Sequence, residues 1–511
     1  MEGQYAVRTC TLVGTEALSV TVEVDIGQGL PGIFIVGLPD VAVQEARQRV
    51  RSALRACSFS IPPARIVVNL APGRLRKSGS GFDLPIAVAV LCATRQIPND
   101  WVDSSLIVGE LSLGGAVRPV QGLLAYARAA GQQDLALVSA PAAELCNLDG
   151  VEYRGIRSLS ELRREPRWHQ PKGTPAAAQP VVGDYADIAG DDIPKRALQI
   201  AAAGEHGLLM MGPPGSGKTM LASRLPTILP PLDADERLES ALIHSIAGLD
   251  TTAVFAGVRP FRAPHHSASI VGLIGGGNPL RFGEVSLAHK GVLFLDEMPE
   301  FSVRVLQALR QPMESGEVVI VRAGYRVRIP SAFMLVAAAN PCPCGYFGDP
   351  DHACRCTQAQ IERYAARIGG PLMDRIDLVV DVMRSDPSEV FRTGSGTSSA
   401  ALRDGVLEAR ARRGFRRARE ASRASGRGTA CSTRPGAAGA GLALVEECKL
   451  EDSARRMFED VSRREHLSSR AIMRVLGVAR TIADIEQSDA VGESHLLEAL
   501  AFRVREQEVP R

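Results

Sequence analysis

The chain lacks any run of 18 or more apolar residues, the length that a membrane-spanning helix needs. Its start, MEGQYAVRTC, also lacks the basic segment and following apolar segment of a secretory signal. We therefore expect no membrane association and a cytoplasmic location. Six of the ten cysteines are scattered along the chain, at Cys10, Cys57, Cys92, Cys146, Cys431 and Cys448. This scatter fits reduced thiols and argues against a disulfide framework.

Lysine is also scarce, because only six of the 59 basic residues are lysines and the other 53 are arginines. Such a skew indicates either recognition of phosphates and carboxylates or a GC-rich genome. The rest of the composition, with 45% hydrophobic and 23% charged residues and a net charge of +2, excludes a disordered or fibrous chain. At roughly 150 residues per domain, the length predicts about three domains.

Apolar runs of strand length divide the middle of the chain, at Leu208–Met211, Val292–Leu295 and Phe333–Ala337. They alternate with longer helix-compatible stretches, the pattern of a parallel α/β sheet. Beyond them, apolar residues at three- and four-residue spacing predict a small helical domain. The predicted segments are an N-terminal domain (1–164), a linker (165–183), the α/β core (184–385), a basic low-complexity segment (386–441) and the helical domain (442–511).

The clearest motif is GPPGSGKT, which matches the phosphate-binding pattern G-x-x-x-x-G-K-[ST] directly after the apolar strand at 208–211. Backbone N–H groups of such a loop wrap the phosphates of ATP, the lysine reaches the β- and γ-phosphates, and the threonine hydroxyl ligates Mg²⁺. The residues predicted to bind ATP are Gly212, Pro213, Pro214, Gly215, Ser216, Gly217, Lys218, Thr219 and Asp296.

Polar side chains follow the next two apolar strands. Asp296 and Glu297 end the strand in GVLFLDE, and Asn340 ends the strand in FMLVAAANP. We expect Asp296 to hold Mg²⁺ with Thr219, and Glu297 to polarise the attacking water. A buried amide is costly without a hydrogen-bonding task, and for Asn340 that task is sensing the γ-phosphate and the water.

Two arginines complete the predicted catalytic set. Arg375, in GPLMDRIDLVV, is placed to reach a neighbouring subunit's nucleotide as an arginine finger. Arg470, in LSSRAIMRVL, begins a helix of the C-terminal domain and is placed to contact the γ-phosphate from within the same chain.

Several longer runs together resemble one family. They are RPFRAPHHSAS, GGGNPLRFGEVSLAHKGVLFLDEMPEF, LRQPMESGEV and AAANPCPCG, and they are similar to the magnesium-chelatase-like AAA+ ATPases of the ComM/YifB family. The resemblance implies a P-loop AAA+ core with a C-terminal helical lid and a hexameric ring motor. It also implies Walker A and B roles for Lys218, Thr219, Asp296 and Glu297, and sensor roles for Asn340 and Arg470.

The N-terminal domain resembles the proteolytic domain of Lon, an α+β fold, at GSGFDLPIAVA and VGELSLGGAVRPVQGLLAYARAA. The alignment puts Ile86 where Lon has its nucleophilic serine and Leu124 where it has the activating lysine. Two aliphatic side chains supply neither a hydroxyl nor an amine, so we predict an inactive Lon-like domain without peptidase activity.

A cysteine cluster lies just after Asn340. Cys342, Cys344, Cys354 and Cys356 form a C-x-C-x₉-C-x-C pattern, and four thiolates from one hairpin can complete a tetrahedral Zn²⁺ site. The spacing inside each pair is tighter than usual, and His352 offers a substitute ligand. Reduced thiols that order the loop are the alternative.

Two further features are ambiguous. Adjacent residues on a strand or helix point apart, so we do not expect His265 and His266 to share a metal, and we place them in a loop that faces DNA or a neighbouring subunit. Residues 402–434 contain ten arginines against three acids, a local net charge of +7. This cluster indicates either a phosphate-binding surface or an arginine-rich solvated linker.

These features predict a homo-hexameric ATPase that moves on single-stranded or branched DNA, a helicase or branch-migration translocase in recombination or natural transformation. Its cofactors are ATP and Mg²⁺, with Zn²⁺ as a further candidate. Two alternatives stay open: a magnesium- or cobalt-chelatase motor subunit, and a scaffold that remodels a protein client.

Overall fold

A computed structural model of the chain describes residues 4–148, 150–171, 183–188, 190, 192–278, 280–322, 325–368, 372–384, 396–425 and 437–503. Most of the predicted linker 165–183 therefore lies outside the described residues, as do Arg427 and Arg434 of the basic segment. The chain forms two compact units. Unit 1 comprises 1–179, 233–257 and 319–329, and unit 2 comprises 180–232, 258–318 and 330–511.

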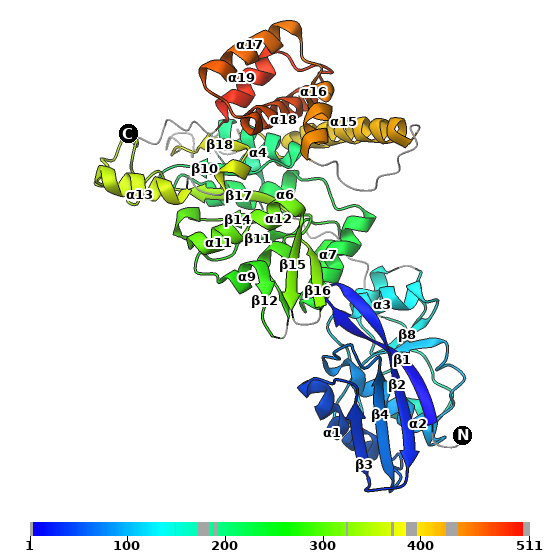
Figure 1. The fold of residues 1–511 in the computed structure, drawn as a ribbon. Helices are drawn as coiled ribbons and strands as arrows, with labels where there is room; N and C mark the ends of the chain where they lie inside the picture. The colour runs from blue at the N-terminus through cyan, green and yellow to red at the C-terminus, as the bar shows by residue number, and fades with distance from the viewer. Residues whose placement is uncertain are drawn as a thin grey trace. The chain divides into compact units, whose positions relative to one another are not determined.

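Unit 1 contains a seven-stranded sheet of order β3-β4-β2-β1-β5-β8-β9 (Figure 1). Its strands are β1 (Gln4–Val13), β2 (Glu16–Gly27), β3 (Gly32–Val36), β4 (Arg65–Ala71), β5 (Ser105–Ile107), β8 (Ala136–Ser139) and β9 (Tyr153–Gly155). Strand β2 pairs antiparallel with both β1 and β4, whereas the remaining pairs are parallel. The apolar residues alternate along β2, and Val20, Val22 and Val24 are buried on one face.

Three helices of unit 1 pack with this sheet, namely α1 (Val41–Ala56), α2 (Asp83–Ala93) and α3 (Leu123–Gln132). Helix α2 is buried along nearly its whole length because almost every residue in DLPIAVAVLCA is apolar. Its one acid, Asp83, is fully buried and accepts two hydrogen bonds from Arg49, at 2.7 and 2.9 Å, and one from the Leu111 N–H. A short hairpin joins β6 (Glu110–Leu111) to β7 (Val117–Arg118).

Two segments from the middle of the sequence belong to unit 1. One holds α7 (Ala234–Ile246) and α8 (Thr252–Phe255), and the Gly122 N–H at the start of α3 donates to the Ser245 carbonyl at 3.0 Å. The other is the outer part of the hairpin of β15 (Glu317–Arg322) and β16 (Tyr325–Pro330). A Cβ added at Gly14, in the β1–β2 turn, would lie 2.4 Å from Val327 Cγ1.

Unit 2 is built on a five-stranded parallel sheet of order β11-β14-β17-β10-β18. The strands are β11 (Phe261–Arg262), β14 (Val292–Leu295), β17 (Met334–Ala339), β10 (Leu208–Met211) and β18 (Leu378–Asp381). The predicted α/β core with a parallel sheet is confirmed. Strand β17 begins one residue later and ends two residues later than the apolar run at 333–337 suggested.

Short helices fill the connections of unit 2. They are α4 (Asp192–Gly204), α5 (Lys218–Ser223), α6 (Leu225–Ile228), α9 (Ile270–Ile274), α10 (Glu284–Leu287), α11 (Val303–Ala308), α12 (Arg310–Ser315) and α13 (Gln358–Ile368). A small hairpin pairs β12 (Gly275–Gly276) with β13 (Arg281–Phe282).

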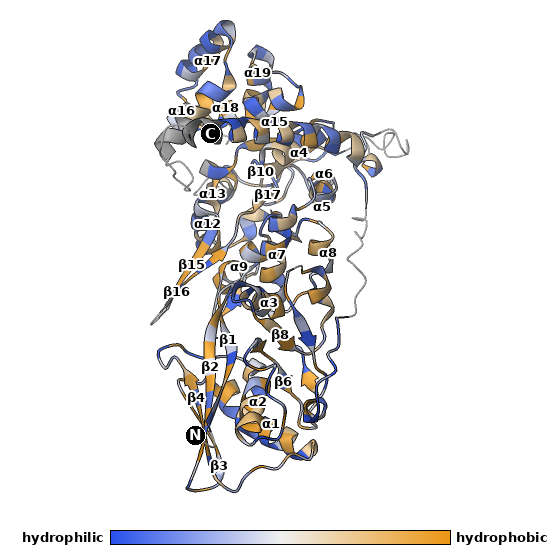
Figure 2. Ribbon diagram, turned by 90° about the vertical axis from the view of Figure 1, so that its right-hand side faces the viewer, coloured by the Kyte–Doolittle hydropathy of each residue, from blue (hydrophilic) through white to orange (hydrophobic). Residues whose placement is uncertain are grey.

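The C-terminal part of unit 2 contains α15 (Ser399–Ser425), α16 (Ala437–Cys448), α17 (Asp452–Arg464), α18 (Ser469–Ile485) and α19 (Glu493–Ala501). Helix α15 lies against α4 and α18 (Figure 1). Figure 2 shows α17 mostly in hydrophilic colours, and only its residues Ala454 and Phe458 are buried. Buried residues of α18 join the core around β10, β17 and β18.

Candidate nucleotide-binding site

The carboxyl ends of three neighbouring parallel strands bring the predicted site residues together. The GPPGSGKT loop follows β10, Asn340 follows β17, and Asp296 with Glu297 follows β14. Because β17 pairs with both β10 and β14 in parallel register, these three strand ends share one edge of the sheet. Ligands of open α/β sheets bind at this edge.

The loop between β10 and α5 has the backbone of a phosphate cradle. Gly215 and Gly217 adopt positive φ angles of 78° and 85°, a region in which side chains with a Cβ are strained. A Cβ at Gly212 would lie 2.0 Å from the Val382 carbonyl oxygen, so the loop also needs glycine for close packing. Helix α5 then starts at Lys218 and directs its N-terminus toward the loop.

Lys218 is buried inside this loop. Its Nζ donates to the carbonyls of Gly212 and Pro213 at 2.8 and 2.9 Å, and lies 3.4 Å from Asn340 Oδ1. Burial lowers the pKa of Lys218, and the negative charges of Asp296 and Glu297 partly oppose that shift. In these contacts the Lys218 ammonium group bonds to neutral oxygen atoms and not to a carboxylate.

Thr219 and Asp296 form the oxygen-rich side of the site. The Thr219 hydroxyl donates to Asp296 Oδ2 at 2.8 Å, and the Glu297 N–H donates to Asp296 Oδ1 at 3.0 Å. Glu297 itself has a left-handed backbone, with φ 50° and ψ 47°. Such strain in a residue that is not glycine costs about 1–3 kcal/mol and is typical of functional sites.

The contact between Glu297 and His266 was not predicted from the sequence. Strand β11 lies beside β14, and the segment after it places His266 Nδ1 3.5 Å from Glu297 Oε2. His265 and His266 lie in a loop, as expected, but the premise that adjacent side chains point apart does not hold there, because their ring centroids are only 4.1 Å from each other. The two residues lie at a turn rather than on a strand or helix, so the alternation of side chains does not apply.

The two predicted arginines have different surroundings. The Arg375 guanidinium pairs with the Glu314 carboxylate of α12 in the same chain. Arg470 is exposed in the first turn of α18. One turn later, Arg474 lies 3.4 Å from the Met373 carbonyl and 4.0 Å from an Asp377 carboxylate oxygen. Helix α18 thus contacts the segment that carries Arg375 through an arginine that sequence reasoning missed.

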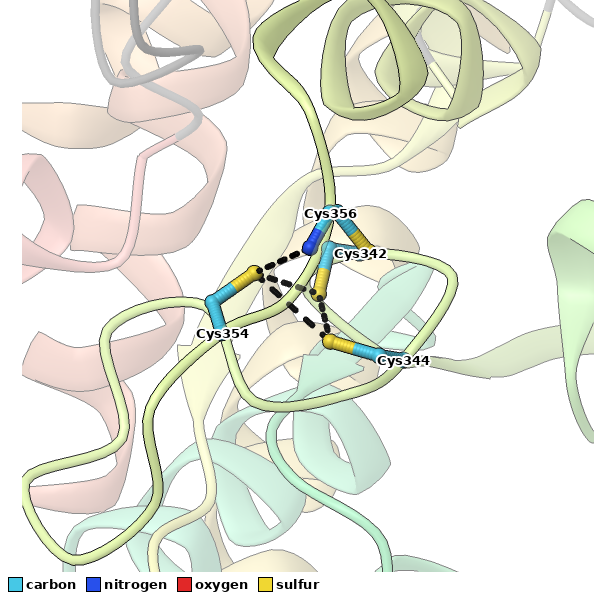
Figure 3. Close-up of side chains that lie close together, drawn as sticks. All are labelled: Cys342, Cys344, Cys354 and Cys356. Carbon is cyan, nitrogen blue, oxygen red and sulfur yellow. Dashed lines mark hydrogen bonds between the residues drawn. The ribbon is translucent and has the colours of Figure 1, made fainter.

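The four clustered cysteines converge within one loop after β17 (Figure 3). The Cys342 sulfur lies 3.3 Å from that of Cys344 and 3.7 Å from that of Cys354, while the Cys344 and Cys354 sulfurs are 3.6 Å apart. Including Cys356, the four sulfurs all lie within 4.8 Å of one another. His352, the predicted substitute ligand, instead stacks on Tyr346 and contacts Arg384.

Part of the basic segment packs against the rest of unit 2, whereas Arg417 and Arg419 are exposed. Arg410 and Arg413 donate to the carbonyls of Ala202 and Gly204 at the end of α4. Both also pair with Glu205. Arg416 makes two hydrogen bonds of 2.6 and 2.5 Å to the buried Asp484 carboxylate of α18. These arginines attach α15 to the rest of unit 2, which leaves less of the local +7 for a nucleic acid.

Comparison with known families gives three consecutive matches. Residues 22–144 match subunit ChlI of Mg-chelatase, residues 184–390 match magnesium chelatase, subunit ChlI, and residues 396–503 match the C-terminal part of that subunit. The middle match contains the loop, the acidic pair and the cysteine cluster.

Full-length relatives are also similar to the chain. The uncharacterized protein YifB of Escherichia coli is 41% identical over 504 residues, covering 97% of this chain and 96% of the relative. The competence protein ComM of Haemophilus influenzae is 39% identical over 506 residues, covering 96% of both. The magnesium-chelatase 67 kDa subunit of Chlorobaculum parvum is 29% identical over 167 residues, only 31% of this chain.

Proposed function

We propose, from the premise that this chain belongs to the magnesium-chelatase-like family of YifB and ComM proteins, that it is an ATP-driven motor that moves on DNA. The family supports an AAA+-type motor. The ATP part of the proposal rests on one observation. The GPPGSGKT loop, Asp296, Glu297 and Asn340 lie together at one edge of the sheet.

The residues present fit Mg-ATP. Oxygen atoms of Thr219 and Asp296 lie 2.8 Å from each other, and hydroxyl and carboxylate oxygens are ligands that Mg²⁺ prefers. The buried Lys218 ammonium and the N–H groups of the glycine loop suit a triphosphate. When bound, Mg²⁺ would neutralise charge that develops on the phosphates.

In this proposal the chain's own side chains position the reaction. Lys218 exchanges its loop carbonyls for phosphate oxygens, and Glu297 orients a water and accepts its proton. Asn340, whose Oδ1 is already 3.4 Å from Lys218, reads whether the γ-phosphate is present. Arg375 acts on a neighbouring subunit's nucleotide after leaving Glu314, and Arg470 acts on the nucleotide of its own chain.

The proposed assembly is a homo-hexameric ring, in which Arg375 would reach the nucleotide of a neighbouring subunit. In this proposal residues 1–164 are an inactive Lon-like domain, and the helices after residue 441 are the lid. Ile86 on α2 and Leu124 on α3 are both fully buried, which supports a scaffold role for this domain rather than peptide hydrolysis.

DNA is favoured over a tetrapyrrole as the target. The family models that match the chain are all named for subunit ChlI, so the relatives carry this preference. The competence protein of Haemophilus influenzae is similar over 96% of this chain, whereas the magnesium-chelatase 67 kDa subunit of Chlorobaculum parvum is similar over 31%. A chelatase motor subunit would depend on a partner protein and would show no DNA-stimulated ATPase activity. A remodelling scaffold would bind no DNA even at low salt.

The test is strand displacement on forked DNA by wild type and by Glu297→Gln. We expect the variant to retain ATP but to lose displacement, because the amide cannot accept the proton of the water. Displacement that survives this substitution would overturn the mechanism. If the wild type displaces no strand and binds no DNA at low salt, the result favours the remodelling scaffold.

We also propose that the cysteine cluster holds a structural zinc ion. Four sulfurs bonded to zinc at about 2.3 Å lie about 3.8 Å apart at the corners of a tetrahedron. The distances between the sulfurs of Cys342, Cys344 and Cys354, which run from 3.3 to 3.7 Å, are close to that edge. Metal analysis of the purified chain tests this assignment, and a protein without stoichiometric zinc would refute it.

A further inference from the structure

The cysteine loop lies directly against the phosphate-binding loop. Gly345, next to Cys344, has φ +85°, and a Cβ added there would lie 2.5 Å from Cδ of Pro214. The backbone at Gly345 therefore packs directly on the Pro214 ring, with no room for a side chain. The Gly345 N–H in turn donates to the Cys342 carbonyl at 2.9 Å, so two of the cysteines frame the residue that contacts Pro214.

Arg384 makes a second connection between the two loops. It follows β18, and its guanidinium lies 3.3 Å from the Pro214 carbonyl and 3.0 Å from His352 Nδ1. The same guanidinium lies 5.6 Å from the centre of the Tyr346 ring and 3.8 Å from the buried carboxylate of Asp349. Arg384 therefore contacts three side chains of the cysteine loop and also a carbonyl of the phosphate-binding loop, and so joins the two loops.

The segment between the cysteine pairs is held by turn hydrogen bonds, such as those from the Asp351 and His352 N–H groups to Asp349, and not by regular secondary structure. Residues 345–353 include two glycines and a proline, and the described part of the segment contains neither a helix nor a strand. A zinc ion joining Cys342 and Cys344 to Cys354 and Cys356 closes this segment at its base. Closure fixes the Gly345 contact and the Arg384 contacts at the same time.

We propose that the zinc-bound cysteine loop braces the phosphate-binding loop, so that ATP affinity depends on zinc occupancy. This inference rests on the ATP and zinc sites proposed above. Zinc takes no part in the reaction. It keeps Pro214, and with it the loop that carries Lys218, in the shape that receives phosphates. Without zinc, part of the binding energy of ATP is spent on ordering that loop.

The experiment uses the full chain in four forms: wild type, Cys354→Ser, Arg384→Ala, and Cys146→Ser as a control at an exposed cysteine outside the cluster. Wild type is studied both as purified and after dialysis against a chelator, with Mg²⁺ restored. Zinc per chain is measured by metal analysis, and the Kd of a fluorescent ATP analogue is measured by titration.

We expect zinc removal and Cys354→Ser each to weaken binding of the analogue about tenfold, with recovery of the chelated wild type when zinc is added back. Arg384→Ala should keep its zinc and still bind the analogue more weakly, while Cys146→Ser should match wild type. The Arg384→Ala variant keeps the test valid if Cys354→Ser does not fold.

Four results would count against the proposal or against one of the two sites on which it rests. Zinc-free wild type that binds the analogue as tightly as the zinc-loaded form overturns the brace. Unchanged affinity in Arg384→Ala overturns the link through that arginine. Wild type that contains no zinc removes the premise of the brace while leaving the ATP site intact, whereas zinc-loaded wild type that binds no analogue contradicts the proposed ATP site itself.

Discussion

The Thr219 hydroxyl donates a 2.8 Å hydrogen bond to the Asp296 carboxylate, which joins residues 77 positions apart in the sequence. It connects the first turn of α5 to the end of β14 through side chains that both suit Mg²⁺. We predict that Thr219→Ala weakens Mg-ATP binding about 10- to 100-fold, the range expected for losing a bond to a charged group. Thr219→Ser, which keeps the hydroxyl, should bind nearly as wild type. Equal affinities in Thr219→Ala and wild type, measured by calorimetry with Mg²⁺, would contradict this role.

The lowered pKa of Lys218 predicts how ATP binding varies with pH. Burial lowers this pKa from its ordinary value of 10.5 in the free site, and a bound triphosphate would raise it again because the charges are opposite. Binding then takes up protons. Affinity should be greatest below the pKa of the free site and should fall as pH rises through it, up to the pKa of the complex.

Titration of the ATP analogue at a series of alkaline pH values measures this dependence. Lys218→Met should bind weakly and lose the pH dependence, because it has no titrating amine. A Kd for wild type that stays constant as pH approaches 10.5 would show that the amine is protonated throughout.

His266 is predicted to position Glu297 rather than to bind a metal. The contact uses Nδ1, at 3.5 Å from the carboxylate. His266→Ala should lower kcat for ATP about tenfold and leave KM unchanged, since orientation of a base affects the chemical step. His266→Asn should recover activity, because its amide nitrogen occupies nearly the position of Nδ1.

His265→Ala is the matched control for this position, since the Nδ1 of that ring contacts the Ser267 hydroxyl at 2.8 Å instead. A purely structural role for His266 would make the alanine and asparagine variants equally defective. It would also lower thermal stability along with kcat.

The arginines of α15 are predicted to affect stability more than DNA binding. Arg416 is paired with Asp484, whose side chain is only 4% exposed. Asp484 also pairs with Arg480 at 3.0 Å, so its carboxylate stays compensated without Arg416. The loss of the charged hydrogen bonds from Arg416 should therefore cost about 1.5–3 kcal/mol. Arg416→Ala should therefore lower the midpoint of urea unfolding without changing the salt dependence of DNA binding. If Arg416→Ala instead made DNA binding less dependent on salt concentration and left stability unchanged, Arg416 would be a phosphate contact.

The meeting of the candidate site residues at one sheet edge was predictable from sequence because the motifs are local. A glycine loop between a strand and a helix, and polar residues at strand ends, place Lys218, Asp296, Glu297 and Asn340 without any knowledge of strand order. The parallel sheet that brings them together follows from alternating apolar runs and helices. The structure contains both features.

Contacts across the chain were not predictable in the same way. Nothing in the spacing of residues indicated that β11 would lie beside β14 and bring His266 to Glu297, or that Arg384 would reach Pro214. The net charge of residues 402–434 was counted correctly from the sequence. That count does not show which of the arginines form ion pairs within the chain. Arg410, Arg413 and Arg416 are paired because α15 packs on α4 and α18, a tertiary feature.

The rate of ATP hydrolysis, measured without DNA, with single-stranded DNA and with branched DNA, tests the central claim most directly. A DNA motor should show a Mg²⁺-dependent rate that DNA increases several-fold in wild type and that Glu297→Gln abolishes under every condition. A rate that DNA leaves unchanged, in a protein that still hydrolyses ATP through Glu297, would contradict a DNA motor and point to a chelatase-type or protein-remodelling motor.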